Sequence, residues 1–123
     1  MVISQWTAPA ITAGDSFTYL VSIEEDGYSR PEGDAFTPGT IAAWRRDEWH
    51  FVAIVVTPVL HGQPLTVSSE SLSAVVWGYF AGKQIGREDI TRDYLPEMQR
   101  NAAVSAREWL VSIGVPADRI MSD

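Results

Sequence analysis

Apolar and polar side chains alternate along the first strongly patterned segment of the chain, residues 17–24. The apolar positions are Phe17, Tyr19, Val21 and Ile23. A period of two residues is typical of a strand with one buried face. Residues 49–59 are apolar at almost every position, which predicts a central strand buried on both faces, closed by Pro58 because proline cannot donate to a ladder.

Two more strands are predicted after the central one. Residues 61–63 are typical of a hairpin connection, so residues 64–68 are interpreted as a return strand. Residues 72–80 are apolar and aromatic again, and Gly78 indicates a bulge or a close backbone approach. Residues 81–92 are polar and are interpreted as a loop, and residues 1–15 as an arm or a loosely held first strand.

Helical patterns occur twice. Thr37 suits a helix N-cap and Pro38 the first turn, so a short helix is predicted there, although one long strand over residues 40–59 remains an alternative for residues 40–48. Residues 94–113 predict an amphipathic helix capped by Asp93 and ended by a glycine. Its apolar face consists of Leu95, Met98, Ala102, Ala106, Trp109 and Ile113.

These elements predict an α+β fold in two layers. We expect a three- to four-stranded, mainly antiparallel sheet, with the C-terminal amphipathic helix on one face and a short additional helix. The 123 residues are expected to form a single domain, and 46% of them are hydrophobic, enough for one core. Ile54 and Trp109 are expected to share that core.

Charge and cysteine content narrow the function classes. A net charge of −7 argues against direct binding to nucleic acid or to anionic membranes. The chain contains no cysteine, which excludes disulfides and thiolate chemistry. No apolar run is long enough to span a bilayer, and the first residues lack a signal-peptide pattern. A cytoplasmic location is therefore expected.

The residue types needed for catalysis do not form a recognisable set. The two histidines, His50 and His61, are isolated from any serine nucleophile motif and lack a metal-ligand spacing. Glu24 and Glu25 are adjacent on a predicted strand and so face opposite sides. We therefore expect no catalytic residue, no metal site and no cofactor, and interpret the chain as non-enzymatic.

Partner-binding residues are predicted on an acidic loop and among the surplus aromatic side chains. Residues 25–34 hold two glycines, one proline and several acids, which is typical of an exposed loop. Five tryptophans are many for one small core, and tryptophan is enriched at interfaces. The candidates are Glu25, Asp26, Tyr28, Glu32, Asp34, Trp44 and Tyr79.

One stretch of sequence resembles a known group of proteins. The strand motif W-x-F-V-x-I-x-V over residues 49–56, the later Ser71-Leu72 and Trp77-Gly78 pairs and the C-terminal amphipathic helix are similar to those of small proteins of actinobacterial phages, prophages and plasmids. The resemblance covers residues 36–112. It implies a mobile-element context and supplies no catalytic residues.

Together these observations predict a small intracellular binding protein, encoded by a phage or mobile element, that acts on a host or phage protein. An acidic DNA mimic that inhibits a restriction, CRISPR or repair enzyme is an alternative, and an enzyme with a carboxylate-based site is a second one. A homodimer is also expected, because a sheet of this size leaves an unpaired edge and the return strand 64–68 carries no lysine.

Overall fold

A computed structural model describes residues 1–11, 16–32 and 35–116. It contains one antiparallel sheet with the strand order β1-β2-β3-β5-β6, and β4 pairs with β3 beside β5. The strands are β1 (Val2–Ala8), β2 (Thr18–Glu25), β3 (Trp49–Leu60), β4 (Gln63–Pro64), β5 (Glu70–Phe80) and β6 (Lys83–Ile85). The predicted α+β class is confirmed, but the predicted number of strands was too low.

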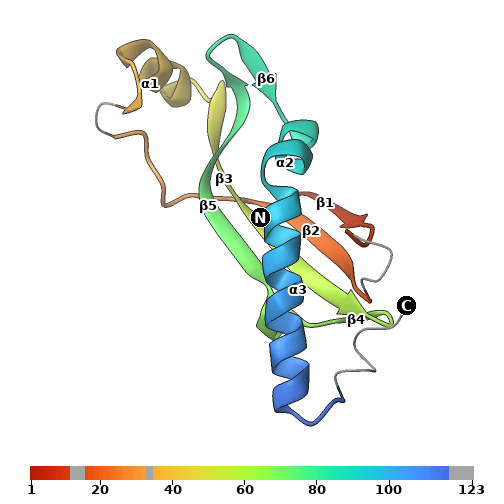
Figure 1. Ribbon diagram of the computed structural model, residues 1–123. Coiled ribbons are helices and arrows are strands. Elements are labelled where there is room, and N and C mark those ends of the chain that lie inside the picture. Colours follow the sequence, from red (N-terminus) through yellow and green to blue (C-terminus); the bar gives the residue numbers. More distant parts are fainter. Residues whose placement is uncertain (12–15, 33–34, 117–123) are drawn as a thin grey trace.

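Helices lie on and beside this sheet. They are α1 (Pro38–Arg45), the 3-10 turn η2 (Thr66–Ser68), α2 (Arg87–Asp93) and α3 (Leu95–Ser112). Helix α3 runs along one face of the sheet, whereas α1 lies at the far end, close to the β5–β6 hairpin (Figure 1). The short helix at residues 38–45 is confirmed, with the Thr37 hydroxyl accepting a hydrogen bond from the backbone N–H of Thr40.

Strand β3 is central, as its apolar sequence predicts, but Pro58 does not close it. The strand continues to Leu60. The carbonyl of Pro58 accepts a hydrogen bond from Leu65, on the side where β5 pairing has already ended at Val56. The nitrogen of Pro58, which carries no hydrogen, faces that same side. Its inability to donate therefore breaks no hydrogen bond between β3 and β5.

The main core lies between α3 and the sheet. Its strands contribute large apolar side chains, with Val21, Ile23 and Ile54 fully buried. Helix α3 contributes the small, fully buried residues Ala102 and Ala106. Ile54 belongs to this core and Trp109 packs against it half-buried, so the predicted shared core is confirmed, with Trp109 at its margin.

A second, smaller cluster of aromatic rings lies on the opposite face of the sheet at the α1 end. Trp49 is fully buried, stacks on Phe36 at 5.7 Å between ring centroids and meets Phe80 edge-to-face at 4.9 Å. Its indole Nε1 donates to the carbonyl of Thr40 in α1. A Cβ at Gly78 would lie 2.8 Å from the Glu48 carbonyl oxygen, which confirms the predicted close approach.

One strand assignment and one loop assignment were wrong. Residues 64–68 do not form a return strand: β4 stops at Pro64, and the 3-10 turn follows. The return strand is β5, which pairs along β3. Residues 81–92 are not a loop, because Ala81 and Gly82 form a hairpin turn with positive φ values of 50° and 83°, and β6 and α2 follow.

The predicted C-terminal helix is confirmed as α3, with two corrections at its ends. Asp93 does not cap it, because Asp93 is the last residue of α2 and its carboxylate pairs with Arg92. Ile113 is 57% exposed, and Leu110 is buried in its place. The buried face follows the 3.6-residue period from Ala106 to Leu110, which leaves Trp109 at its margin.

The N-terminal segment is a strand rather than an arm over residues 2–8. β1 pairs with β2 in an antiparallel register from Val2–Glu24 to Ala8–Tyr19, with one bulge near its start. Among the described residues, no helix has the length and apolar character needed to cross a lipid bilayer.

Candidate functional site

The sheet extends past the N-terminal end of α3, and a groove lies at this end of the molecule, beside α1 (Figure 1). The groove has a volume of about 380 Å³. It lies between the loop after β2, helix α1 and the start of β3, and we call it the α1-end groove. The residues used below to describe it are Glu25, Asp26, Arg30, Trp44, Arg45, Asp47 and His50.

The α1-end groove combines an aromatic surface with both signs of charge. The Arg30 guanidinium lies over the Trp44 ring, 5.7 Å from its centroid, close enough for a cation–π contact. Glu25 and Asp47 contribute exposed carboxylates to the same groove, and Arg45 an exposed guanidinium. Mixed charges around a tryptophan suit contact with a polypeptide better than contact with a polyanion.

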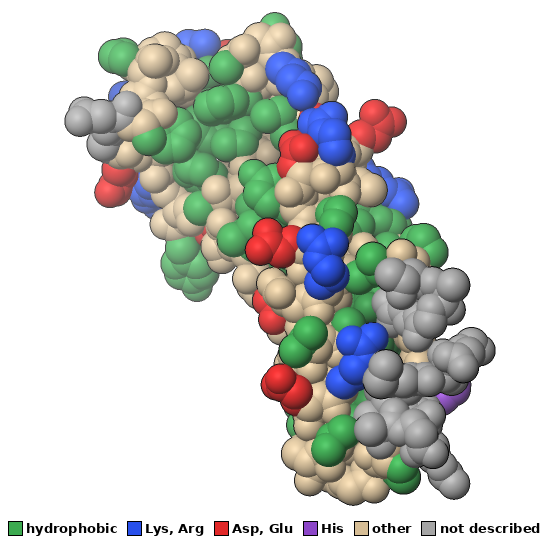
Figure 2. Space-filling model, viewed as in Figure 1, with side chains coloured by type: hydrophobic (Ala, Val, Ile, Leu, Met, Phe, Trp, Pro, Cys, Tyr) green, Lys and Arg blue, Asp and Glu red, His purple; other side chains and the backbone are tan. Residues whose placement is uncertain are grey.

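A row of ring side chains continues the groove across the sheet. The register places His50 of β3 directly opposite Trp77 of β5, so both point to the α3 side of the sheet. Tyr79 lies two residues further along β5 and is 51% exposed. The next residue, Phe80, points to the other face of the sheet and packs on Trp49. Hydrophobic side chains gather between α1 and the β5–β6 hairpin in Figure 2.

Asp26 lines this groove, and its carboxylate holds the surrounding loop in place. Its carboxylate accepts hydrogen bonds from the Ser29 hydroxyl at 2.6 Å, from the backbone N–H of Ala74 at 2.9 Å and from those of Tyr28 and Ser29. These bonds, led by the one from Ser29, lower the pKa of Asp26 from 3.8 to about 2. The carboxylate therefore ties the loop after β2 to the bulge of β5.

The seven predicted partner-binding residues separate into groups. Glu25, Asp26 and Trp44 line the α1-end groove, and Tyr79 extends it. Tyr28 is 97% exposed on the adjoining loop. Glu32 is exposed but does not line the groove, and Asp34 lies outside the described residues.

Sequence reasoning missed five residues of this site, namely Arg30, Arg45, Asp47, His50 and Trp77. Arg30 and Arg45 were not selected, because nothing in the sequence brings them to Trp44. Trp77 was assigned to a strand, but the face of the sheet on which it lies was not predicted. The alternation of Val75, Trp77 and Tyr79 shows that these residues share one face of β5. Only the register with β3 shows which face that is.

The histidines cannot act together. His50 lies at the start of β3, and His61 follows its end in an exposed turn, so the length of the strand, roughly 35 Å, separates them. Among residues 1–11, 16–32 and 35–116, no group of three or more His, Cys, Asp or Glu side chains has the arrangement of a metal site.

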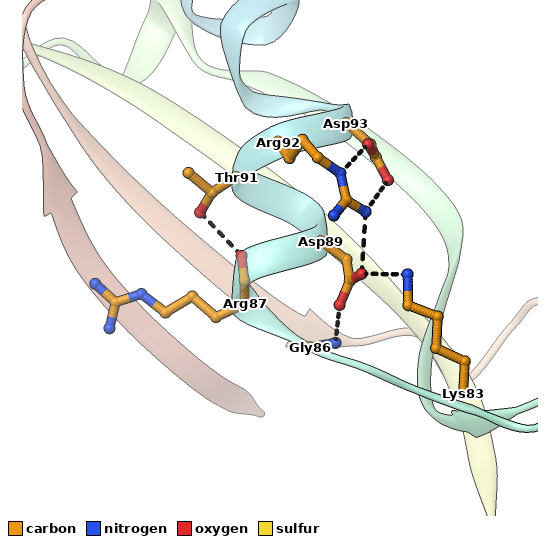
Figure 3. Close-up of polar contacts among 7 residues, drawn as sticks. All are labelled: Lys83, Gly86, Arg87, Asp89, Thr91, Arg92 and Asp93. Carbon is orange, nitrogen blue, oxygen red and sulfur yellow. Dashed lines mark hydrogen bonds and ion pairs between the residues drawn. The ribbon is translucent and has the colours of Figure 1, made fainter.

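A network of charged side chains lies at the start of α2. The Asp89 carboxylate accepts from the Gly86 N–H at 2.9 Å and pairs with Lys83 Nζ at 3.0 Å and with Arg92 at 3.1 Å (Figure 3). The Gly86 bond and the Lys83 pair lower the pKa of Asp89 to about 2. The network closes the first turn of α2, and Arg87 points away from it.

Several acids of the described chain are paired with bases. Glu48, Asp89 and Asp93 are paired with Arg or Lys, and the face drawn in Figure 2 shows single acids among bases. Glu24 and Glu25 lie on opposite faces of β2, as expected from their adjacency.

Comparison with protein-family models, with curated protein sequences and with solved structures gave no match.

Proposed function

We propose that this protein is a non-enzymatic binding protein that holds a segment of another protein in the α1-end groove and on the adjoining row of His50, Trp77 and Tyr79. The observation that carries the proposal is the uncovered end of the sheet, where a groove with both signs of charge adjoins exposed aromatic surface. Aromatic side chains and arginine are the residue types most enriched at protein interfaces.

The support for a protein ligand comes from the composition of the site. Trp44 and Tyr79 offer large rigid surfaces that lose little conformational entropy on binding. Arg30 already lies over Trp44, so the aromatic side chain is held in place before a partner arrives. The carboxylate of Glu25 and the guanidinium of Arg45 supply opposite charges for selecting a partner.

The two other functions receive no specific support from the described residues. A DNA mimic requires a row of unpaired carboxylates, whereas several acids here are paired with bases. A carboxylate-based enzyme would need a carboxyl with a raised pKa as its acid, but Asp26 in the groove is shifted in the opposite direction. The intracellular setting and the mobile-element origin stay predictions from the sequence.

The test is quantitative affinity capture from the organism that encodes the protein. Wild-type protein is compared with a double variant, Trp44→Ala with Tyr79→Ala, which removes aromatic surface from the groove and from the row. We expect one or more captured proteins to be lost or reduced about tenfold or more with the double variant, because interface aromatics are common binding hot spots.

The matched control removes exposed apolar surface elsewhere. Val104 and Val111 are 51% and 52% exposed on α3, and Val104→Ala with Val111→Ala should leave capture unchanged. Loss of capture with the α3 variant but not with the groove variant would move the binding surface to α3 and overturn the proposal.

A further inference from the structure

Strand β1 forms one edge of the sheet, and in the described part of the chain no strand pairs with its outer side. Its residues Val2–Ala8 include no charged side chain and no proline. Natural edge strands are commonly protected against pairing by lysine, proline or a bulge. The bulge of β1 lies between Val2 and Ser4, which leaves residues 4–8 regular and unprotected.

The hydrogen-bond pattern shows which backbone groups β1 presents outward. Glu25 donates its N–H to the chain preceding β1 rather than to β3, so by alternation Val21 also bonds to β1. The register places Val21 opposite Trp6, and Trp6 therefore bonds inward. Its neighbours Gln5 and Thr7 direct their N–H and C=O groups to the open edge.

The other edge of the sheet is less suited to pairing. β6 covers only the last residues of β5 and is itself three residues long. The rest of β5 is interrupted by a register shift and by Ala74, whose φ is +59° and whose N–H is already bound by Asp26. A bulge of this kind breaks the regular spacing that an added strand needs.

We propose that β1 pairs with β1 of a second copy of this chain, antiparallel about a two-fold axis at Trp6. In this register Gln5 of one copy lies opposite Thr7 of the other, and each pair exchanges both of its N–H···O=C hydrogen bonds. The two Trp6 side chains become neighbours at the non-hydrogen-bonded position, where side chains are closest. Two sheets thereby become one continuous sheet.

Charge explains why a second copy fits this edge. Each copy has a net charge of −7, which opposes association wherever acids meet. The first eleven residues carry no charged side chain. The groove beside β1, with a volume of about 410 Å³, has one charged lining residue, Arg87, which lies 4.2 Å from the Trp6 ring centroid. The two copies therefore meet along strands that carry no acidic side chain, so their negative net charges do not meet at the contact.

Sedimentation velocity of the purified full chain tests the proposal. Wild-type protein is measured from low micromolar to about a hundred micromolar, where a weak dimer dissociates on dilution. Thr7→Pro removes one outward N–H and should give a monomer with little change in melting temperature, because edge strands tolerate proline there.

A second variant keeps the test valid if Thr7→Pro misfolds. Gln5→Lys places a charge on the edge and should weaken the dimer about tenfold or more. Thr66→Lys makes the same charge change on the exposed η2 turn and should dimerise like wild type. A wild-type protein that is monomeric at every concentration, or a dimer that survives both edge variants, would overturn the proposal.

Cysteine cross-linking tests the register, since the chain has no cysteine of its own. The variants Gln5→Cys and Thr7→Cys are purified separately, mixed and oxidised. Directly opposed residues are about 5.5 Å apart between Cα atoms, within the range of a disulfide. Cross-links between the two variants should exceed those within either one. Cross-linking mainly within the Gln5→Cys variant would reject the Trp6-centred axis.

Discussion

The two ends of the sheet are held in different ways. Under α3, aliphatic strand residues such as Ile54 pack against small helix residues such as Ala106, and one continuous core results. At the α1 end, Trp49 and its neighbouring rings form a separate cluster on the opposite face, although no residue of α1 itself is buried. The long strands connect the two regions (Figure 1).

This difference explains where a binding surface can exist. Because the aromatic cluster stabilises the α1 end from one face, the other face there does not need α3 to cover it. The α1-end groove lies beside α1, and the uncovered face carries the exposed ring of Tyr79. The comparison therefore predicts that the two ends respond differently to substitution.

The largest effect is expected from Trp49→Ala. Trp49 is fully buried and donates to the Thr40 carbonyl, so its loss should lower the free energy of unfolding by about 3–5 kcal/mol. Urea unfolding measures it. The control is Trp44→Ala, half-buried on α1, which should cost about 1 kcal/mol or less. Equal losses would mean that the aromatic cluster does not stabilise this end.

A slightly smaller loss is expected in the main core. Ile54→Ala should cost about 2–4 kcal/mol through lost burial and a cavity. Val55→Ala, half-buried on the other face of the same strand, should cost about 1 kcal/mol. A loss below about 1 kcal/mol for Ile54→Ala would show that Ile54 does not lie in a continuous, tightly packed core under α3.

The close approach at Gly78 sharpens the comparison further. Gly78→Ala adds a Cβ 2.8 Å from a backbone oxygen at a φ of +109° and should cost about 2 kcal/mol. Gly62→Ala also falls at positive φ, but nothing lies within 4 Å of its added Cβ. The difference between the two melting temperatures isolates the contact, and no difference would contradict it.

The smallest effect concerns acid. Because the pKa of Asp26 falls to about 2 on folding from 3.8, its ionised form stabilises the fold above pH 4, and that contribution is lost as pH falls toward 2. Asp26→Asn should be less stable than wild type at pH 6, with the gap closing near pH 2. Thermal unfolding across this range measures the gap, and a gap that widens on acidification would contradict the assignment.

The sequence predicts this fold best where one period dominates. The alternation of residues 17–24, the apolar run of β3 and the helical period of α3 each match an observed element. The return strand was misplaced because Pro64 and Leu65 look like the start of a strand. Pairing with β3 instead stops at Pro64, and after the 3-10 turn it resumes at Glu70. β6 and α2 were missed because Ala81-Gly82 is a weaker hairpin signal than Asn-Gly.

The candidate site was predicted less completely, for a physical reason. Trp44 and Glu25 were identified from residue type alone, and both line the groove. Arg30 reaches Trp44 only after a loop has folded back, and Trp77 meets His50 only through the register of β3 with β5. Such contacts depend on tertiary pairing, which periodicity in a single segment does not specify.

Site-specific photocross-linking tests the central claim most directly, that partners bind at the α1 end and not along α3. A photoreactive phenylalanine analogue replaces Tyr79 in one variant and Val111 in another, both about half exposed, and each is irradiated in the organism that encodes the protein. The account predicts a covalent adduct with another protein from position 79 and none from position 111. Adducts from position 111 alone would contradict it.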